Sequence, residues 1–142
     1  MLDLNASIEP GKAAAGLALG DPVATLSQAG QLARHQLGDG HELLDFGSVR
    51  VWAKDGVIDQ IGVLGGYTGR VGGTAIGIGS TIQQVVDAIG AVVEDDEDNL
   101  TVPAVAGLCF ETEVWRDGGR GTVEENLDAK LTEIFVFAVR AS

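Results

Sequence analysis

Few residues of chemically reactive type occur in this sequence, and their spacing does not bring them together. His35 and His41 lie six residues apart with no cysteine near them, whereas a structural metal site needs about four ligands at close spacing. Cys109 lies in an apolar stretch, where a free cysteine usually acts as a small hydrophobic residue. As a nucleophile it would need a histidine and an orienting group nearby. We therefore expect no metal site, no cofactor and no enzymatic activity.

Three further segments resemble ligand-binding loops only in part. The segment Gly77–Ile82 begins like a dinucleotide-binding loop, but Ile82 stands where the third glycine is required. The segment Gly65–Gly73 lacks the Gly-Lys-Ser/Thr ending of a phosphate loop. The acidic run Glu94–Asn99 is followed by neither the glycine nor the bidentate glutamate of a calcium-binding loop. The sequence therefore favours neither phosphate nor calcium binding at these segments.

Negative charge is the strongest chemical feature of the chain, and it is concentrated in one part. The formal net charge is −12; residues 1–90 hold 9 acidic and 5 basic residues, whereas residues 91–128 hold 11 and 2. This charge argues against direct nucleic-acid binding and would steer the protein toward a basic partner. The alternative interpretation is that acidic loops serve only to keep the protein in solution.

The candidate partner-binding residues are acids of this region together with aromatic side chains. Carboxylates can pair with lysines and arginines of a basic cleft, and aromatic residues are frequent anchors of interfaces. Glu111 and Glu113 alternate along a predicted strand, so we expect them on one sheet face, away from Phe110. Trp52 parallels Trp115 in position and could simply pack in the core. The candidate set is Glu94, Asp95, Asp96, Glu97, Asp98, Glu111, Glu113, Tyr67 and Trp115.

Length and composition predict one domain over residues 1–142, because a 142-residue chain with 45% apolar residues can bury a sizeable core. The 21 glycines are about twice the usual share of roughly 7%, which favours many short strands joined by tight turns. A single cysteine excludes an internal disulfide. The first residues do not resemble a signal peptide, and no apolar run approaches the ~18 residues of a membrane span. We therefore expect a cytoplasmic protein without a membrane partner.

Two segments share a pattern that predicts an internal repeat. Leu17–Leu26 and Ile76–Val85 each begin with alternating apolar residues and a glycine, followed by a helix N-cap residue, Asp21 or Ser80. In the second segment the apolar spacing from Ile82 to Ile89 predicts an amphipathic helix that ends at the following glycine. We therefore expect one helix at the start of each repeat.

Strand-like runs follow each predicted helix, although Gln31–Gln36 could form a second short helix in the first repeat. Asp55-Gly56 and Asp117-Gly118 are hairpin signals within these runs. The runs are 41–47, 49–56, 57–63, 100–107, 109–118 and 131–137. Together these elements predict an α+β fold of two pseudo-repeats, at about residues 10–66 and 70–139. Each repeat would supply a helix and about three strands to one antiparallel sheet, with both helices on one face.

A family resemblance is carried by short motifs spread over the chain: Pro10–Lys12, Gly16–Gly20, Gly66–Gly69, Ile76–Thr81 and Gly107–Glu111. They resemble small acidic immunity proteins of bacterial polymorphic toxin systems, of the contact-dependent inhibition and Rhs types. That resemblance implies a cytoplasmic antitoxin that binds and blocks one toxin domain, often a nuclease. The repeated architecture also resembles the β-lactamase inhibitory protein and assembly lipoproteins of that fold, although their paired or lipidated cysteines are absent here.

Charge and resemblance together lead to a functional expectation. The protein would be an immunity protein that occludes the basic active-site cleft of a toxin domain through electrostatic complementarity. One alternative is a small-ligand-binding or assembly module of the same fold, in which the acids serve only solubility. An enzyme is the other alternative, ranked last because no nucleophile–base or metal constellation is present.

Overall fold

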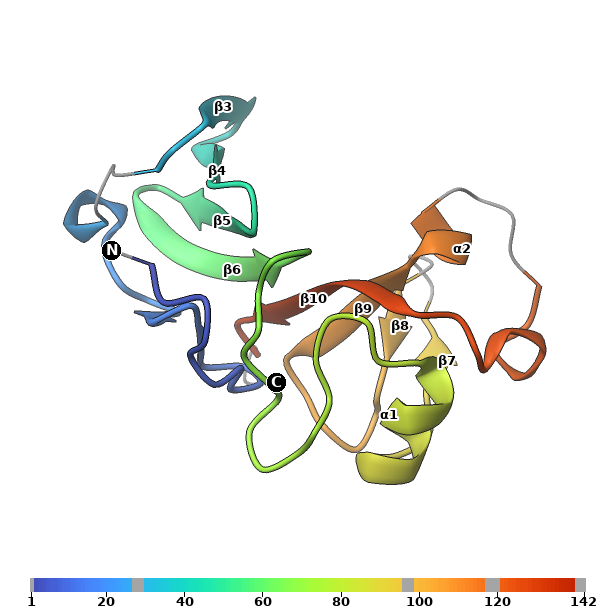
Figure 1. The fold of residues 1–142 in the computed structure, drawn as a ribbon. Coiled ribbons are helices and arrows are strands. Elements are labelled where there is room, and N and C mark those ends of the chain that lie inside the picture. The colour runs from blue at the N-terminus through green and yellow to red at the C-terminus, as the bar shows by residue number, and fades with distance from the viewer. Residues whose placement is uncertain (1, 27–29, 96–98, 117–120, 140–142) are drawn as a thin grey trace.

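The computed structural model describes residues 2–26, 30–95, 99–116 and 121–139 of the chain. Across these residues the protein is mostly β, and one long antiparallel sheet runs through the molecule (Figure 1). This sheet holds eight of the described strands in the order β3-β4-β5-β6-β10-β9-β8-β7, and β1 and β2 pair separately. The strands are β1 (Ala13–Ala14), β2 (Leu17–Ala18), β3 (Ala33–Gly38), β4 (His41–Asp45), β5 (Val49–Lys54), β6 (Val57–Val63), β7 (Val93–Glu94), β8 (Leu100–Thr101), β9 (Leu108–Thr112) and β10 (Leu131–Phe137).

Helices form only a small part of the described chain. The α-helices there are α1 (Ile82–Ala88) and α2 (Glu113–Arg116), and the 3-10 helices are η1 (Val23–Thr25) and η2 (Glu124–Asn126). Not one of these described helices has both the length and the apolar character that crossing a membrane requires.

The predicted α+β fold of two helix-plus-strand repeats is therefore wrong. The antiparallel sheet is present, but only α1 corresponds to a predicted helix, and the helix expected after Asp21 is replaced by η1. Tertiary hydrogen bonds explain this difference, because Val23 donates its backbone N–H to Gly56 O at 2.8 Å and Pro22 forms a β-bridge with Val57. These bonds attach residues 22–25 to the β5–β6 hairpin. The β-branched residues of this segment, Val23 and Thr25, also favour a helix only weakly.

The short helix considered for Gln31–Gln36 is also absent, because most of that segment lies in β3. The turn that follows explains this, since Asp39 and Gly40 have φ values of 52° and 80° and connect β3 to β4. Positive φ at both central residues is typical of the tight hairpin turn that matches the twist of its strands. The predicted Asp55-Gly56 hairpin is confirmed on the same grounds, with φ values of 51° and 80° between β5 and β6.

The predicted helix at Ile82 is confirmed as α1, with its N-cap one residue later than expected. The Thr81 side chain accepts a hydrogen bond from Gln84 N at 3.2 Å, and the Gln84 side chain accepts one from Thr81 N at 2.8 Å. This reciprocal capping box satisfies backbone donors that a helix otherwise leaves open. Ser80, the expected cap, instead accepts from Gly77 N at 3.0 Å and so stabilises the turn before the helix.

One face of the sheet, called here the core face, packs against the rest of the chain. Ile61, at the centre of this face, is fully buried. The N-terminal segment, the connection from β6 to α1 and α1 itself all contribute buried apolar residues to the same cluster. Tyr67, in that connection, accepts a hydrogen bond from Ala15 N at 2.9 Å and donates one to Ala6 O at 2.5 Å. The tyrosine hydroxyl therefore joins the N-terminal segment to the β6–α1 connection.

Candidate functional site

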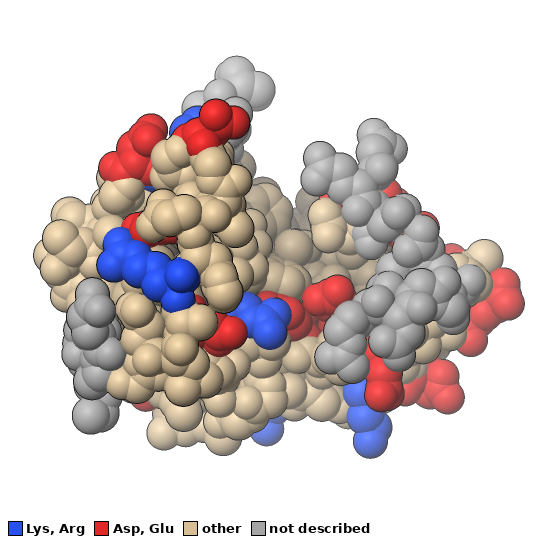
Figure 2. All heavy atoms as spheres, turned by 90° about the horizontal axis from the view of Figure 1, so that it is seen from above, with Lys and Arg blue, Asp and Glu red and all other residues tan. Residues whose placement is uncertain are grey.

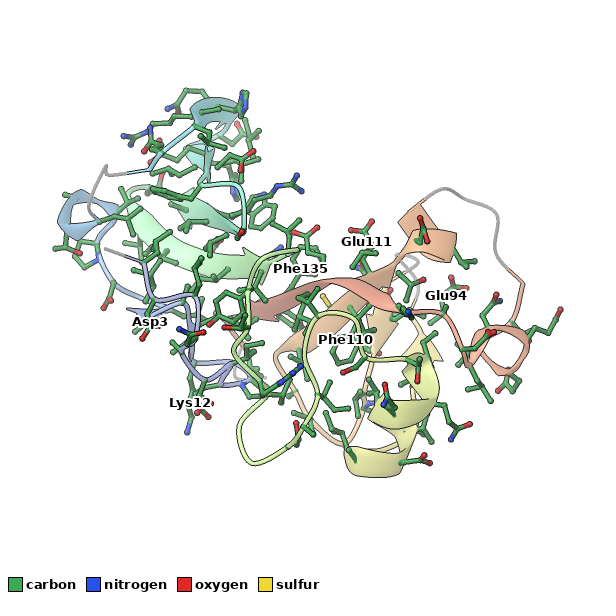
Figure 3. The ribbon with its side chains drawn as sticks, viewed as in Figure 1. Asp3, Lys12, Glu94, Phe110, Glu111 and Phe135 are labelled. Carbon is green, nitrogen blue, oxygen red and sulfur yellow. The ribbon has the colours of Figure 1, made fainter. Side chains whose placement is uncertain are left out.

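The opposite face of the sheet, called here the open face, carries the candidate site. Because successive strand residues point to opposite faces, cross-strand partners form a row on one face. Figure 3 illustrates this alternation in β9, where Phe110 points toward α1 and Glu111 points away from it. No described element lies across the open face, and α2 stands at one end of it (Figure 1). The central row of the open face consists of Asp45, Arg50, Gly62, Phe135, Cys109 and Thr101.

The open face is hollowed. Figure 2 looks down on it and shows the described atoms near its middle lying deeper than those of the half that carries β3–β5. Near the middle of this view, basic atoms lie directly beside acidic ones, and further acidic atoms gather on the α2 half. A concave surface with convergent polar groups is the usual form of a binding site.

An aromatic pair lies at the centre of the open face, above a glycine. The rings of Trp52 and Phe135 are tilted by 55° with centroids 5.8 Å apart, a favourable aromatic geometry. Gly62 lies beneath them; a Cβ atom there would stand 3.1 Å from each of these rings and 2.7 Å from a carboxylate oxygen of Glu133. The missing side chain at Gly62 therefore allows two aromatic rings and a carboxylate to converge over one strand.

Charged side chains surround this aromatic pair. Arg50 Nη1 lies 3.6 Å from Glu133 Oε1, and Arg50 Nε lies 4.0 Å from Asp45 Oδ2. Glu133 is only 4% exposed, and Glu111 is its direct cross-strand partner. Like charges placed opposite each other on a sheet repel, so a nearby cation stabilises them. The open face therefore combines an arginine with several carboxylates in a partly buried setting.

A pocket of about 280 Å³ opens on the same face, over β6, β10, β9 and β8. Burial raises the pKa of the Cys109 thiol in this pocket to about 12, with further contributions from the carboxylates of Asp95, Glu133 and Glu111. The thiol is therefore protonated at neutral pH and is a poor nucleophile. The pocket is lined by Gln60, Asp95, Asn99, Thr101, Cys109, Phe135 and Phe137.

The structure brings together two of the predicted acidic residues, Asp95 and Glu111. Asp95 lines the pocket, and its Oδ1 accepts a hydrogen bond from Asn99 N at 2.9 Å while its own N–H donates to Asn99 O at 2.9 Å. Glu111 lies on the same face, in β9. Asp96, Glu97 and Asp98, the other predicted members of this acidic run, lie outside the described residues.

The remaining predicted residues occupy other positions. Glu94 is exposed in β7, at the edge of the sheet. Glu113 does not share a strand face with Glu111, because β9 ends at Thr112 and Glu113 begins α2. Tyr67 is 4% exposed and donates to Ala6, so its burial does not leave it available as a partner anchor. The backbone of Trp115 lies in α2, and its side chain is outside the described part of the molecule, as is the Asp117-Gly118 hairpin signal.

Several open-face residues did not belong to the predicted set, although alternation in the sequence could have found them. The segment Val49–Lys54 places Arg50 and Trp52 on one face, and the segment Leu131–Phe137 places Glu133 and Phe135 on one face. No pattern in the sequence indicated that β6 pairs with β10. That pairing places these two sets of residues side by side.

Within the described parts of the chain, no group of three or more histidine, cysteine, aspartate or glutamate side chains is arranged to hold a metal ion. Comparisons of the chain with protein-family models, with curated proteins and with solved structures give no match. The chemistry of the open face is therefore the basis for a functional proposal.

Proposed function

We propose that this protein is an immunity protein that neutralises a cognate bacterial toxin domain by binding it, with the open face as the contact surface. The toxin domain would be basic, and a nuclease is the class that fits best, since a nuclease must present a basic cleft to phosphates. The mechanism is steric occlusion of that cleft and requires no catalytic residue. The protein would act in the cytoplasm of the cell that it protects.

The observation that carries this proposal is the proximity of the Trp52–Phe135 pair to the carboxylate of Glu111 on a concave sheet face, where the buried Glu133 adds negative charge beneath the surface. Half-buried aromatic residues and charged residues that lose water on binding are the typical sources of interface affinity. The negative charge of residues 91–128, with 11 acidic and 2 basic residues, supports a basic partner. Complementary charge also accelerates association, which suits an antitoxin that must act before its toxin does.

The test is a capture experiment followed by a growth assay. The tagged protein would be used to isolate binding proteins from the source cell and from cells that co-express the neighbouring genes. The expected result is a basic domain of a larger secreted protein, bound in an equimolar complex. Expression of that domain alone should stop growth of a heterologous host, and co-expression of this chain should restore it.

Two charge-reversal variants make the growth assay specific for the open face. Glu111→Lys changes the open face, whereas Asp87→Lys changes an exposed acid on α1, whose buried residues belong to the core-face cluster. We expect Glu111→Lys to abolish rescue and Asp87→Lys to retain it, with equal protein levels for both. Rescue by both variants would exclude the open face as the contact surface, and failure to capture a toxic domain would refute the antitoxin function.

A further inference from the structure

The pocket on the open face has a composition that suits one kind of ligand group. The rings of Phe135 and Phe137 stand on adjacent same-face positions of β10. Asp95 supplies a carboxylate, and Gln60, Asn99 and Thr101 supply further oxygen atoms that can accept hydrogen bonds. Flat aromatic surfaces beside a carboxylate and neutral acceptors are the environment in which organic cations bind.

The volume of the pocket limits the size of its occupant. Pockets for whole small-molecule ligands span about 300–1,000 Å³, and this pocket is near 280 Å³. This volume, at the lower limit of that range, is enough for one side chain and small for a nucleotide or an organic cofactor. The nearby carboxylates of Glu111 and Glu133 give the pocket a negative potential, which also contributes to the raised pKa of Cys109.

We propose that this pocket receives a single arginine side chain of the protein partner, with the guanidinium paired to Asp95 and stacked on the rings of Phe135 and Phe137. This inference rests on the proposed function, since the arginine belongs to the basic domain that the open face binds. The guanidinium is planar, always charged and carries five N–H donors, so it can use the carboxylate, the neutral acceptors and the aromatic surface together. A lysine ammonium is a compact, strongly hydrated point charge and has no planar surface for stacking.

A titration with model side chains tests the pocket without the partner. Methylguanidinium, methylammonium and urea would be added to ¹⁵N-labelled protein, and backbone amide shifts would be followed by NMR. We expect saturable shifts with methylguanidinium in about the millimolar range, centred on Asn99, Thr101, Cys109 and Phe135. Methylammonium should bind more weakly, and urea, which is planar but uncharged, should give no saturable shift. Equal responses to urea and methylguanidinium would overturn the proposal, as would shifts located elsewhere.

Conservative variants test separately the negative charge and the aromatic ring of the pocket. Asp95→Asn keeps the oxygen that accepts from Asn99 but removes the charge, and Phe137→Leu keeps an apolar side chain but removes the ring. Each should weaken methylguanidinium binding about tenfold. Asp87→Asn removes the same unit of charge from α1 and should leave the affinity unchanged. Equal affinity for the wild type, Asp95→Asn and Phe137→Leu would refute the assignment.

Binding measurements with the captured partner show whether the arginine pocket or the antitoxin function is wrong. If a toxic domain is captured and neutralised, Asp95→Asn should weaken its binding by at least about tenfold, and replacement of one arginine in the partner should remove that difference. A captured partner that binds wild type and Asp95→Asn equally would refute the arginine pocket and leave the antitoxin function intact. Binding of methylguanidinium in the pocket without any toxic partner would refute the antitoxin function alone.

Discussion

At the scale of single residues, the convergence of side chains over Gly62 is the feature on which the open face most depends. Gly62 lies in β6, between Arg50 and Phe135 in the cross-strand row. A Cβ atom at this position would meet Glu133 at 2.7 Å and Trp52 at 3.1 Å, distances shorter than normal contacts. These side chains would have to move apart, and the pairing of rings and charges would be lost.

We expect Gly62→Ala to destabilise the protein by about 1–3 kcal/mol, which is the usual cost of overpacking a well-filled site. Gly65→Ala is the matched control, since Gly65 is exposed and nothing lies within 4 Å of a Cβ atom there. That control should be neutral or more stable by up to about 1 kcal/mol. Urea unfolding of both variants provides the measurement, and equal stabilities would contradict the close packing seen over Gly62.

The buried thiol of Cys109 leads to a prediction about alkaline pH. Its pKa is raised to about 12 in the folded protein, mainly by burial, whereas an unfolded cysteine titrates near about 8.5. Above about pH 9 the unfolded chain therefore holds fewer protons than the folded chain, so the free energy of unfolding falls as the pH rises. Burial also raises the pKa of Tyr67, which acts in the same direction at higher pH.

Urea unfolding between pH 8 and 11 checks this prediction. The wild type should lose stability over that range, and Cys109→Ala should lose less, because it retains only the contribution of Tyr67 and other groups. The same pH dependence in both proteins would show that the thiol titrates normally. Slow alkylation of Cys109 by iodoacetamide at pH 8 is a second expected sign of the protonated thiol.

At the scale of elements, α1 has seven residues and depends on its cap, because a helix of this length has little stability of its own. Thr81→Ala removes the hydroxyl that accepts from Gln84 N, and we expect a loss of about 1 kcal/mol. Thr81→Ser retains that hydroxyl and should stay close to the wild type. Chemical denaturation of both variants distinguishes them, and equal losses would show that the methyl group of Thr81, not its cap, stabilises α1.

The hairpins show why local turn residues outweighed helical propensity in the first half of the chain. Asp39-Gly40 and Asp55-Gly56 both adopt positive φ values, and each connects two strands of the sheet. Such a turn fixes the register of the residues on both sides, so Gln36 pairs with Glu42 instead of continuing a helix. Arg34 then reaches across to Glu42, with Nη2 2.8 Å from Oε1, and strengthens the same pairing.

At the scale of the whole molecule, the uneven charge predicts how the partner is found. Glu94 to Asp98 are five of the 11 acidic residues between positions 91 and 128, and Asp95, the second of them, lines the pocket of the open face. Neutralising Glu94, Asp95, Asp96, Glu97 and Asp98 together should slow association with the basic partner and reduce its sensitivity to salt. Stopped-flow association rates at several ionic strengths provide the measurement. A salt dependence equal to that of the wild type would exclude electrostatic steering by this segment.

Sequence by itself determined the local features of this protein. Alternating apolar residues predicted β5, β6 and β10, the Asp55-Gly56 pair predicted a hairpin, and helical spacing predicted α1. These predictions hold because strand faces, tight turns and amphipathic helices depend on neighbours within a few residues. Charge alone also pointed to Asp95 and Glu111, which lie on the open face, and their role as partner contacts stays a prediction.

Only the tertiary structure decided which of these features meet. The pairing of β6 with β10 joins the two halves of the sheet and brings Arg50 and Trp52 beside Glu133 and Phe135, which lie about 80 residues away in the sequence. Hydrogen bonds from the β5–β6 hairpin turned the expected first helix into η1, and burial among N-terminal residues made Tyr67 a structural residue. Contacts between distant segments depend on how the whole chain packs, and no local pattern encodes them.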